Sequence, residues 1–132
     1  MAYKQLEEES LVAGLRSRVR VLSIRASRIP GVEIVELEGD DVSVTMDIHK
    51  ELLVFREGDE LDMVVSKDLP SYKDGKDFCA RGIVVSIKDG GDSARVVISL
   101  WGYLVIIRPR DRSIINGLGL KPSDEIYYCL LK

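Results

Sequence analysis

The sequence is poor in the residues that carry most enzyme chemistry. It contains one histidine, His49, and two cysteines, Cys79 and Cys129. A structural zinc site takes four cysteine or histidine ligands, so these three residues do not complete one. A serine triad needs a histidine as general base, and His49 has no Gly-x-Ser-x-Gly motif to accompany it. We therefore expect no catalytic residue and no metal site.

Phosphate-binding loops are also missing. The chain has neither Gly-x-x-x-x-Gly-Lys-Ser/Thr nor Gly-x-Gly-x-x-Gly. Gly117-Leu118-Gly119 resembles half of such a loop, but no strand is predicted before it and no helix after it. Asp47 and Glu51 are a candidate carboxylate pair, although Asp47 is better explained as an outward strand residue and Glu51 as a turn residue. The sequence predicts no cofactor and no enzyme activity of its own.

The two cysteines lie far apart, each inside an apolar run. Two buried thiols are the favoured interpretation, since free cysteine behaves as a small apolar residue. A disulfide between Cys79 and Cys129 is the alternative, and cytosolic proteins seldom keep one.

Long apolar runs do not occur. None approaches the roughly 18 residues that a membrane-spanning helix needs. The first ten residues carry Glu7, Glu8 and Glu9 and lack the apolar centre of a secretory signal. A cytoplasmic location is expected.

Charge of one sign is scarce in two stretches. Residues 16–28 hold five arginines and no acid, whereas residues 33–62 hold eleven acids against Lys50 and Arg56. A third cluster is basic and contains Arg108, Arg110 and Arg112. Such asymmetry indicates either a surface that docks onto a charged partner or a solvated rim of alternating sign.

The dominant pattern is alternation of apolar and polar residues with period two, which is typical of half-buried strands. In residues 42–48, Val42, Val44, Met46 and Ile48 alternate with Ser43, Thr45 and Asp47. Turn residues punctuate the chain at Gly39, Gly58 and Asp89 to Asp92. Strands are predicted over residues 20–26, 32–37, 42–48, 61–65, 78–87, 94–100, 103–107 and 126–131, with a further short apolar run at 52–55.

No convincing helix is predicted; residues 7–15 are a marginal candidate because Gly14 weakens them. Gly82, in the middle of the 78–87 strand, predicts a bulge or bend. About eight short strands separated by turns favour an all-β fold, and specifically a small antiparallel β-barrel similar to the OB fold. We expect one barrel domain over residues 1–132, with a loosely packed segment at 1–15.

Aromatic residues make up only 6% of the chain, yet Trp101 and Tyr103 lie close in sequence to the second basic cluster, at Arg108, Arg110 and Arg112. OB-type barrels bind single strands through basic grooves and stacked aromatics. Protein interfaces also favour Trp, Tyr and Arg, and burial of the aromatics in the core is the third possibility. The candidate interface residues are Trp101, Gly102, Tyr103, Arg108 and Arg110.

Four blocks in order resemble the RNA polymerase subunit shared by the three eukaryotic nuclear polymerases, subunit eight, whose archaeal counterpart is called the G subunit or, again, subunit eight. The blocks are residues 20–26 (RVLSIRA), 44–52 (VTMDIHKEL), 99–105 (SLWGYLV) and 127–132 (YYCLLK). The likeness covers residues 18–132. His49 stands where the family usually has Asn, and Trp101 where it usually has the first Gly of a pair. The short polar segment 66–77 suits an archaeal member.

The resemblance implies an eight-stranded barrel that serves as a non-catalytic, structural subunit of DNA-directed RNA polymerase. It further implies docking mainly on the largest subunit, contact with nucleic acid only through the complex, and no active-site residue here. A free-standing barrel that binds single-stranded nucleic acid through its arginine clusters is the alternative.

Overall fold

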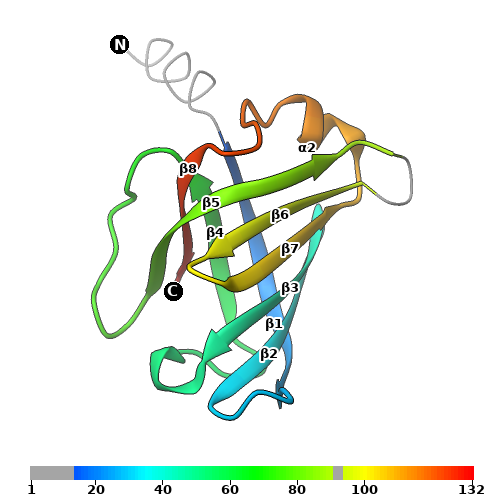
Figure 1. The fold of residues 1–132 in the computed structure, drawn as a ribbon. Helices are drawn as coiled ribbons and strands as arrows, with labels where there is room; N and C mark the ends of the chain where they lie inside the picture. The colour runs from blue at the N-terminus through cyan, green and yellow to red at the C-terminus, as the bar shows by residue number, and fades with distance from the viewer. Residues whose placement is uncertain (1–13, 91–93) are drawn as a thin grey trace.

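The computed structural model describes residues 14–90 and 94–132 and confirms an all-β chain. Eight antiparallel strands close into a small OB-like barrel in the order β1-β2-β3-β7-β6-β5-β8-β4, with β4 pairing back onto β1 (Figure 1). The strands are β1 (Gly14–Ala26), β2 (Val32–Gly39), β3 (Val42–His49), β4 (Glu60–Ser66), β5 (Phe78–Lys88), β6 (Arg95–Leu100), β7 (Tyr103–Pro109) and β8 (Glu125–Leu131).

The alternation seen in the sequence separates the interior of the barrel from its exterior. Along β3 every second side chain is buried, so that Val44 and Met46 point inward while Thr45 and Asp47 remain half-buried outside. The core is mostly aliphatic. Among its few aromatic side chains, Tyr128 is completely buried. Burial raises the pKa of the Tyr128 phenol, whose hydroxyl donates to the Met46 sulfur at 3.3 Å.

Strand β1 begins six residues earlier than the sequence predicted, at Gly14 rather than Arg20. The first part of the strand has a polar sequence because Arg16 and Arg18 point outward. Ser17 and Val19, which alternate with them, are nevertheless buried. The marginal helix candidate at 7–15 falls largely outside the described residues, and its last two residues start β1. The loosely packed segment predicted at 1–15 likewise lies almost wholly outside them.

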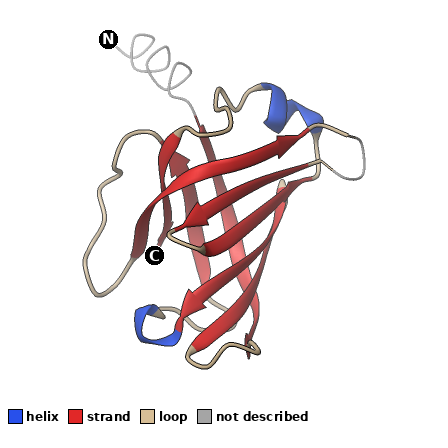
Figure 2. Ribbon diagram, viewed as in Figure 1, coloured by secondary structure: helices blue, strands red, loops and turns tan. Residues whose placement is uncertain are grey.

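Two short helical segments lie at opposite ends of the barrel (Figure 2). A 3-10 turn, η1 (Lys50–Leu52), follows β3, and a five-residue helix, α2 (Arg112–Asn116), follows β7. The absence of any helix was therefore a wrong prediction for residues 112–116. This helix forms because the Asp111 side chain caps it by accepting the Ser113 amide at 2.9 Å. The apolar run 52–55 forms no strand; it brings Phe55 into the core.

The predicted irregularity of β5 lies three residues beyond Gly82. The register against β6 shifts between Val84 and Ser86, so the bulge is at Val85. Gly82 is needed for another reason: a Cβ there would lie 2.6 Å from both a Leu100 methyl carbon and the Ser99 carbonyl oxygen. A side chain at this position would collide with the neighbouring strand.

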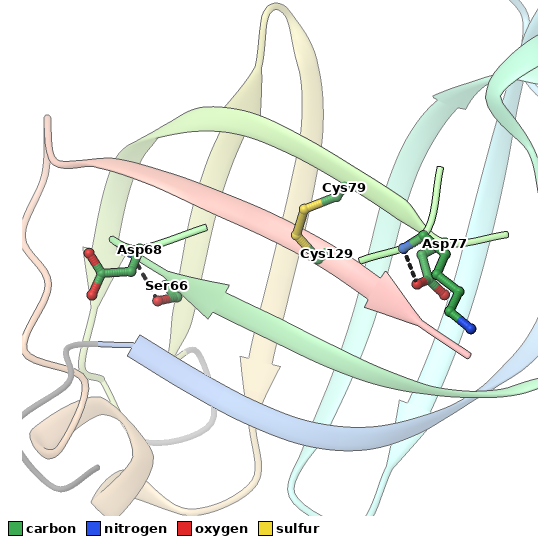
Figure 3. Close-up of a disulfide and its surroundings, with 6 residues drawn as sticks. Ser66, Asp68, Asp77, Cys79 and Cys129 are labelled. Carbon is green, nitrogen blue, oxygen red and sulfur yellow. Dashed lines mark hydrogen bonds between the residues drawn. A yellow bond between two sulfur atoms is a disulfide. The ribbon is translucent and has the colours of Figure 1, made fainter. Parts of the chain in front are cut away.

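The favoured interpretation of the cysteines, two separate buried thiols, is wrong. Strands β5 and β8 are neighbours, and their register places Cys79 directly opposite Cys129. The two side chains are joined by a disulfide across the strand pair (Figure 3). The sequence separation of the two cysteines is 50, so their pairing could not be predicted without knowing which strands are neighbours.

Candidate protein-docking surface

Strands β6 and β7 are joined by a two-residue turn, Trp101-Gly102. The last pair of the two strands is Leu100 with Tyr103, which leaves only these two residues between them. Both turn residues have positive φ, 56° for Trp101 and 99° for Gly102. A type I′ hairpin turn requires this combination and usually takes Asn-Gly or Gly-Gly. The Ser99 hydroxyl oxygen accepts the Gly102 amide at 3.0 Å and supports the turn.

Trp101 is unusual in this position. The left-handed conformation costs an ordinary L-residue about 1–2 kcal/mol, because Cβ approaches the following carbonyl oxygen. The side chain gains little burial in return, since 84% of its surface remains exposed. Burial of this tryptophan in the core, the third possibility raised by the sequence, is thereby excluded. Strain combined with exposure directs attention to a role in recognition.

Tyr103 behaves differently from Trp101. It is half-buried and packs against the core as the first residue of β7. Trp101 stands between two hollows of the surface, one containing Tyr103 and the other containing Ile83 and Ser99. The turn therefore separates a cleft at this end of the barrel from the outer face of β5, β6 and β7.

That outer face is apolar, which is unexpected for a sheet that meets water. In the register, Ile83 on β5 pairs with Ser99 on β6, which pairs with Leu104 on β7. Further along, Val97 on β6 pairs with Ile106 on β7. We call the following residues the outer apolar face: Ile83, Val85, Val97, Leu104 and Ile106, of which Ile83, Val85 and Leu104 are 41–50% exposed.

The outer apolar face was not predicted from the sequence, although a signal was present. Residues 96–98 and 103–107 are apolar at every position, whereas a half-buried strand is apolar only at every second one. Continuous apolar strands are typical of sheets covered on both sides. The barrel interior covers one side of β6 and β7, so the second apolar side indicates an external partner.

The two predicted arginines lie at the other end of β7 from the Trp101 turn. Arg108 is exposed and continues the outward series that begins with Leu104 and Ile106. Arg110 lies beyond the strand, where its guanidinium forms an ion pair with Glu38 and its amide donates to the Asp41 carbonyl at 2.8 Å. The five candidate residues thus do not form one cluster: the turn and the arginines mark opposite ends of one strand.

The arginines of the basic stretch 16–28 are partly paired with acids. Strand β1 lies between β2 and β4, so acids from both neighbours meet its arginines. Arg16 and Arg18 both reach Asp62, at 3.3 and 3.1 Å, and Arg25 reaches Glu36 at 3.7 Å. Three of the five arginines of this stretch thus already have an acidic partner, which does not favour the nucleic-acid alternative.

Two features are absent from the part of the chain that the structure describes: a cluster of metal-ligating side chains and a helix that could span a membrane. Over residues 14–90 and 94–132, no three His, Cys, Asp or Glu side chains are grouped as a metal site would require. His49 instead ends β3, where its Nδ1 accepts the Glu51 amide at 3.2 Å. None of the helices in these same ranges has the length and apolar character to cross a membrane.

Comparison with known proteins gives a consistent result. Residues 15–132 match the family described as the G subunit of DNA-directed RNA polymerase. The chain is 30% identical to DNA-directed RNA polymerase subunit Rpo8 of Sulfolobus acidocaldarius over 89% of its length and 98% of that protein. It is 28% identical to Rpo8 of Saccharolobus solfataricus, over 94% of this chain and 97% of the relative. A solved structure of the molybdate-binding protein ModG is similar over 91% of each chain, at 18% identity and a TM-score of only 0.35.

Proposed function

The chain belongs to the family of the RNA polymerase G subunit, and from this premise we propose that the outer apolar face, with Trp101 at its edge, is the surface by which it docks onto the polymerase. The protein is an archaeal-type, non-catalytic structural subunit of DNA-directed RNA polymerase. Its partners are other subunits of that enzyme. Nucleotidyl transfer belongs to the whole complex.

The observation that carries the docking surface is the apolar exterior of three adjacent strands. Exposed apolar patches on soluble proteins mark protein contacts, and permanent interfaces are the more hydrophobic ones. Trp101 adds a large aromatic side chain at the edge of this face, and interface anchors are enriched in tryptophan. Arg108 at the opposite end of β7 supplies a polar margin.

Three finer statements are part of the same proposal. The largest subunit is the main partner, as the family resemblance implies. The protein works in the cytoplasm as one barrel domain over residues 1–132. Nucleic acid is contacted only through the assembled polymerase, a view supported by the ion pairs that occupy Arg16, Arg18 and Arg25.

Recovery from native extract tests this function. The tagged chain is expected to bring down the large polymerase subunits in stoichiometric amount, and the recovery should persist at about 0.5 M salt, because apolar contacts are not screened. Cross-linking of the recovered complex identifies the subunit that faces β7. Recovery of the chain alone, or with nucleic acid and no polymerase, would overturn the proposal.

Replacing Trp101 by asparagine is expected to have opposite effects on folding and on assembly. Trp101→Asn relieves the left-handed strain, so the isolated barrel should gain about 1 kcal/mol of unfolding free energy. Loss of the exposed anchor should weaken binding to the polymerase about 30-fold, equivalent to about 2 kcal/mol. Urea unfolding and a binding titration measure the two effects.

The matched variant Trp101→Tyr keeps both the strain and an aromatic ring. It should leave the stability of the isolated barrel unchanged and retain most of the affinity. A destabilised Trp101→Asn barrel would show that the indole packs against the fold and is not reserved for a partner.

A further inference from the structure

The cleft on the Tyr103 side of Trp101 is a second feature of this end of the barrel. It is a hollow of about 450 Å³ between three parts of the chain: the end of β3 with η1, the segment 72–80, and the β6–β7 turn. In Figure 1, η1, the loop before β5 and the turn between β6 and β7 all lie on the left side of the barrel. The apolar part of its lining includes Leu52, Val54, Phe78 and Tyr103, so the cleft is shaped to receive an apolar side chain.

The acidic and basic side chains that line this cleft are all of one sign. Its lining contains four carboxylates and neither lysine nor arginine; the carboxylates are Asp47, Glu51, Asp74 and Asp77. Lys73, Lys76 and Lys132 belong to a different hollow on the other side of the 72–77 segment, together with Arg16. The structure gives no ion pair to the side chains of Asp47, Glu51 or Asp74 among the described residues, so their charge is available to a partner.

Asp77 holds the acidic side of the cleft in place. Its carboxylate accepts the amides of Lys73 and Lys132, each at 2.8 Å, and so ties the 67–77 loop to the residue that follows β8. Figure 3 labels Asp77 and marks one hydrogen bond to its carboxylate. Partial burial opposes ionisation, but the two amide hydrogen bonds together with the nearby charges of Lys73 and Lys132 lower the pKa of this carboxyl group. The loop that carries Asp74 is therefore anchored at its C-terminal end.

We propose that this cleft receives a segment of a partner polymerase subunit that presents an apolar side chain flanked by lysine or arginine. The apolar lining accommodates the side chain, and the carboxylates on the rim pair with the flanking cations. The exposed ring of Trp101 forms one wall, where a cation can also lie over the aromatic face. A phosphate backbone or an acidic peptide would be repelled by the same rim.

This inference rests on the proposed function but concerns a separate contact, because the outer apolar face lies on the other side of the Trp101 turn. The two contacts differ in salt dependence. Binding through the outer apolar face should change little with ionic strength, whereas pairing of exposed charges weakens as salt rises. Salt dependence therefore separates a failure of the cleft from a failure of docking.

The test is the affinity of the full chain for polymerase purified without this subunit, at about 0.05 M and about 0.5 M salt. The triple variant Asp47→Asn, Glu51→Gln, Asp74→Asn removes three charges with almost no change of shape. We expect it to bind about tenfold more weakly than wild type at low salt, and within about twofold of wild type at high salt.

A matched triple, Asp40→Asn, Asp41→Asn, Glu60→Gln, removes the same charges from exposed carboxylates remote from the cleft. It should bind as wild type does at both salt concentrations. Equal binding by the cleft triple and wild type at low salt, or an equal loss in both triples, overturns the cleft and leaves the docking face intact. Failure of wild type itself to bind overturns the proposed function, and the cleft inference falls with it.

Discussion

A glutamate in place of Leu104 is expected to abolish assembly with the polymerase while leaving the barrel folded. Leu104 begins the outward series on β7 and is 41% exposed in the free chain. An exposed position tolerates a charge at a cost below about 1 kcal/mol. The same charge buried against an apolar partner surface, without a counter-ion, should cost about 3 kcal/mol or more. Affinity for the polymerase should fall more than about 100-fold.

Leu22 provides a matched control for this experiment. It is also an exposed leucine on a strand, at 52%, but β1 lies across the barrel from β6. Leu22→Glu should change neither the unfolding free energy nor the affinity by more than about 0.5 kcal/mol. If Leu104→Glu assembles as wild type does, the outer apolar face is not the docking surface. If Leu22→Glu loses as much affinity as Leu104→Glu, the effect is one of net charge.

Removal of the disulfide is expected to have the largest effect on stability. Cys79 and Cys129 close a loop with a sequence separation of 50 residues, and the bond restricts the unfolded chain accordingly. In the chain-entropy model a loop of this length contributes about 4 kcal/mol. A domain of this size has about 5–15 kcal/mol in total, so the loss is a large fraction of the whole. Cys79→Ala, Cys129→Ala should therefore unfold at a clearly lower urea concentration.

Reductant supplies the control for the disulfide prediction. Wild type should lose stability on reduction by a similar amount, whereas the double alanine variant should not respond to reductant. Thiol titration of unreduced, unfolded wild type should detect no free thiol. Detection of two thiols under those conditions would contradict the disulfide and restore the two buried thiols favoured by the sequence.

The barrel was predictable because period-two alternation is a local property. In β3 the alternation of Val44, Met46 and Ile48 with Thr45 and Asp47 identifies both the strand and its inward face. Turn residues mark most strand ends because their backbone preferences are also a local property. Strand β1 was predicted too short, and α2 was missed, because arginines on an outward face and a five-residue capped helix leave weak local signals.

The candidate surface was predictable only in part. Trp101 and Gly102 were chosen as neighbours in sequence, and the structure places them in a strained, exposed turn. Arg110 was chosen in the same way, but its ion pair joins it to Glu38, 72 residues away. The pairings of Arg16 and Arg18 with Asp62 are also remote in sequence. Such ion pairs depend on strand order, which alternation does not encode.

The sequence by itself determined the all-β class, most strand positions, the lack of catalytic motifs and the family resemblance, because each depends on residue types or on spacing along the chain. Tertiary structure alone decided the contacts between distant segments. It paired Cys79 with Cys129, set arginines of β1 against acids of β2 and β4, and brought Ile83 and Leu104 onto one exposed face. The physical reason is that barrel closure determines which strands become neighbours, and this order cannot be read from any single strand.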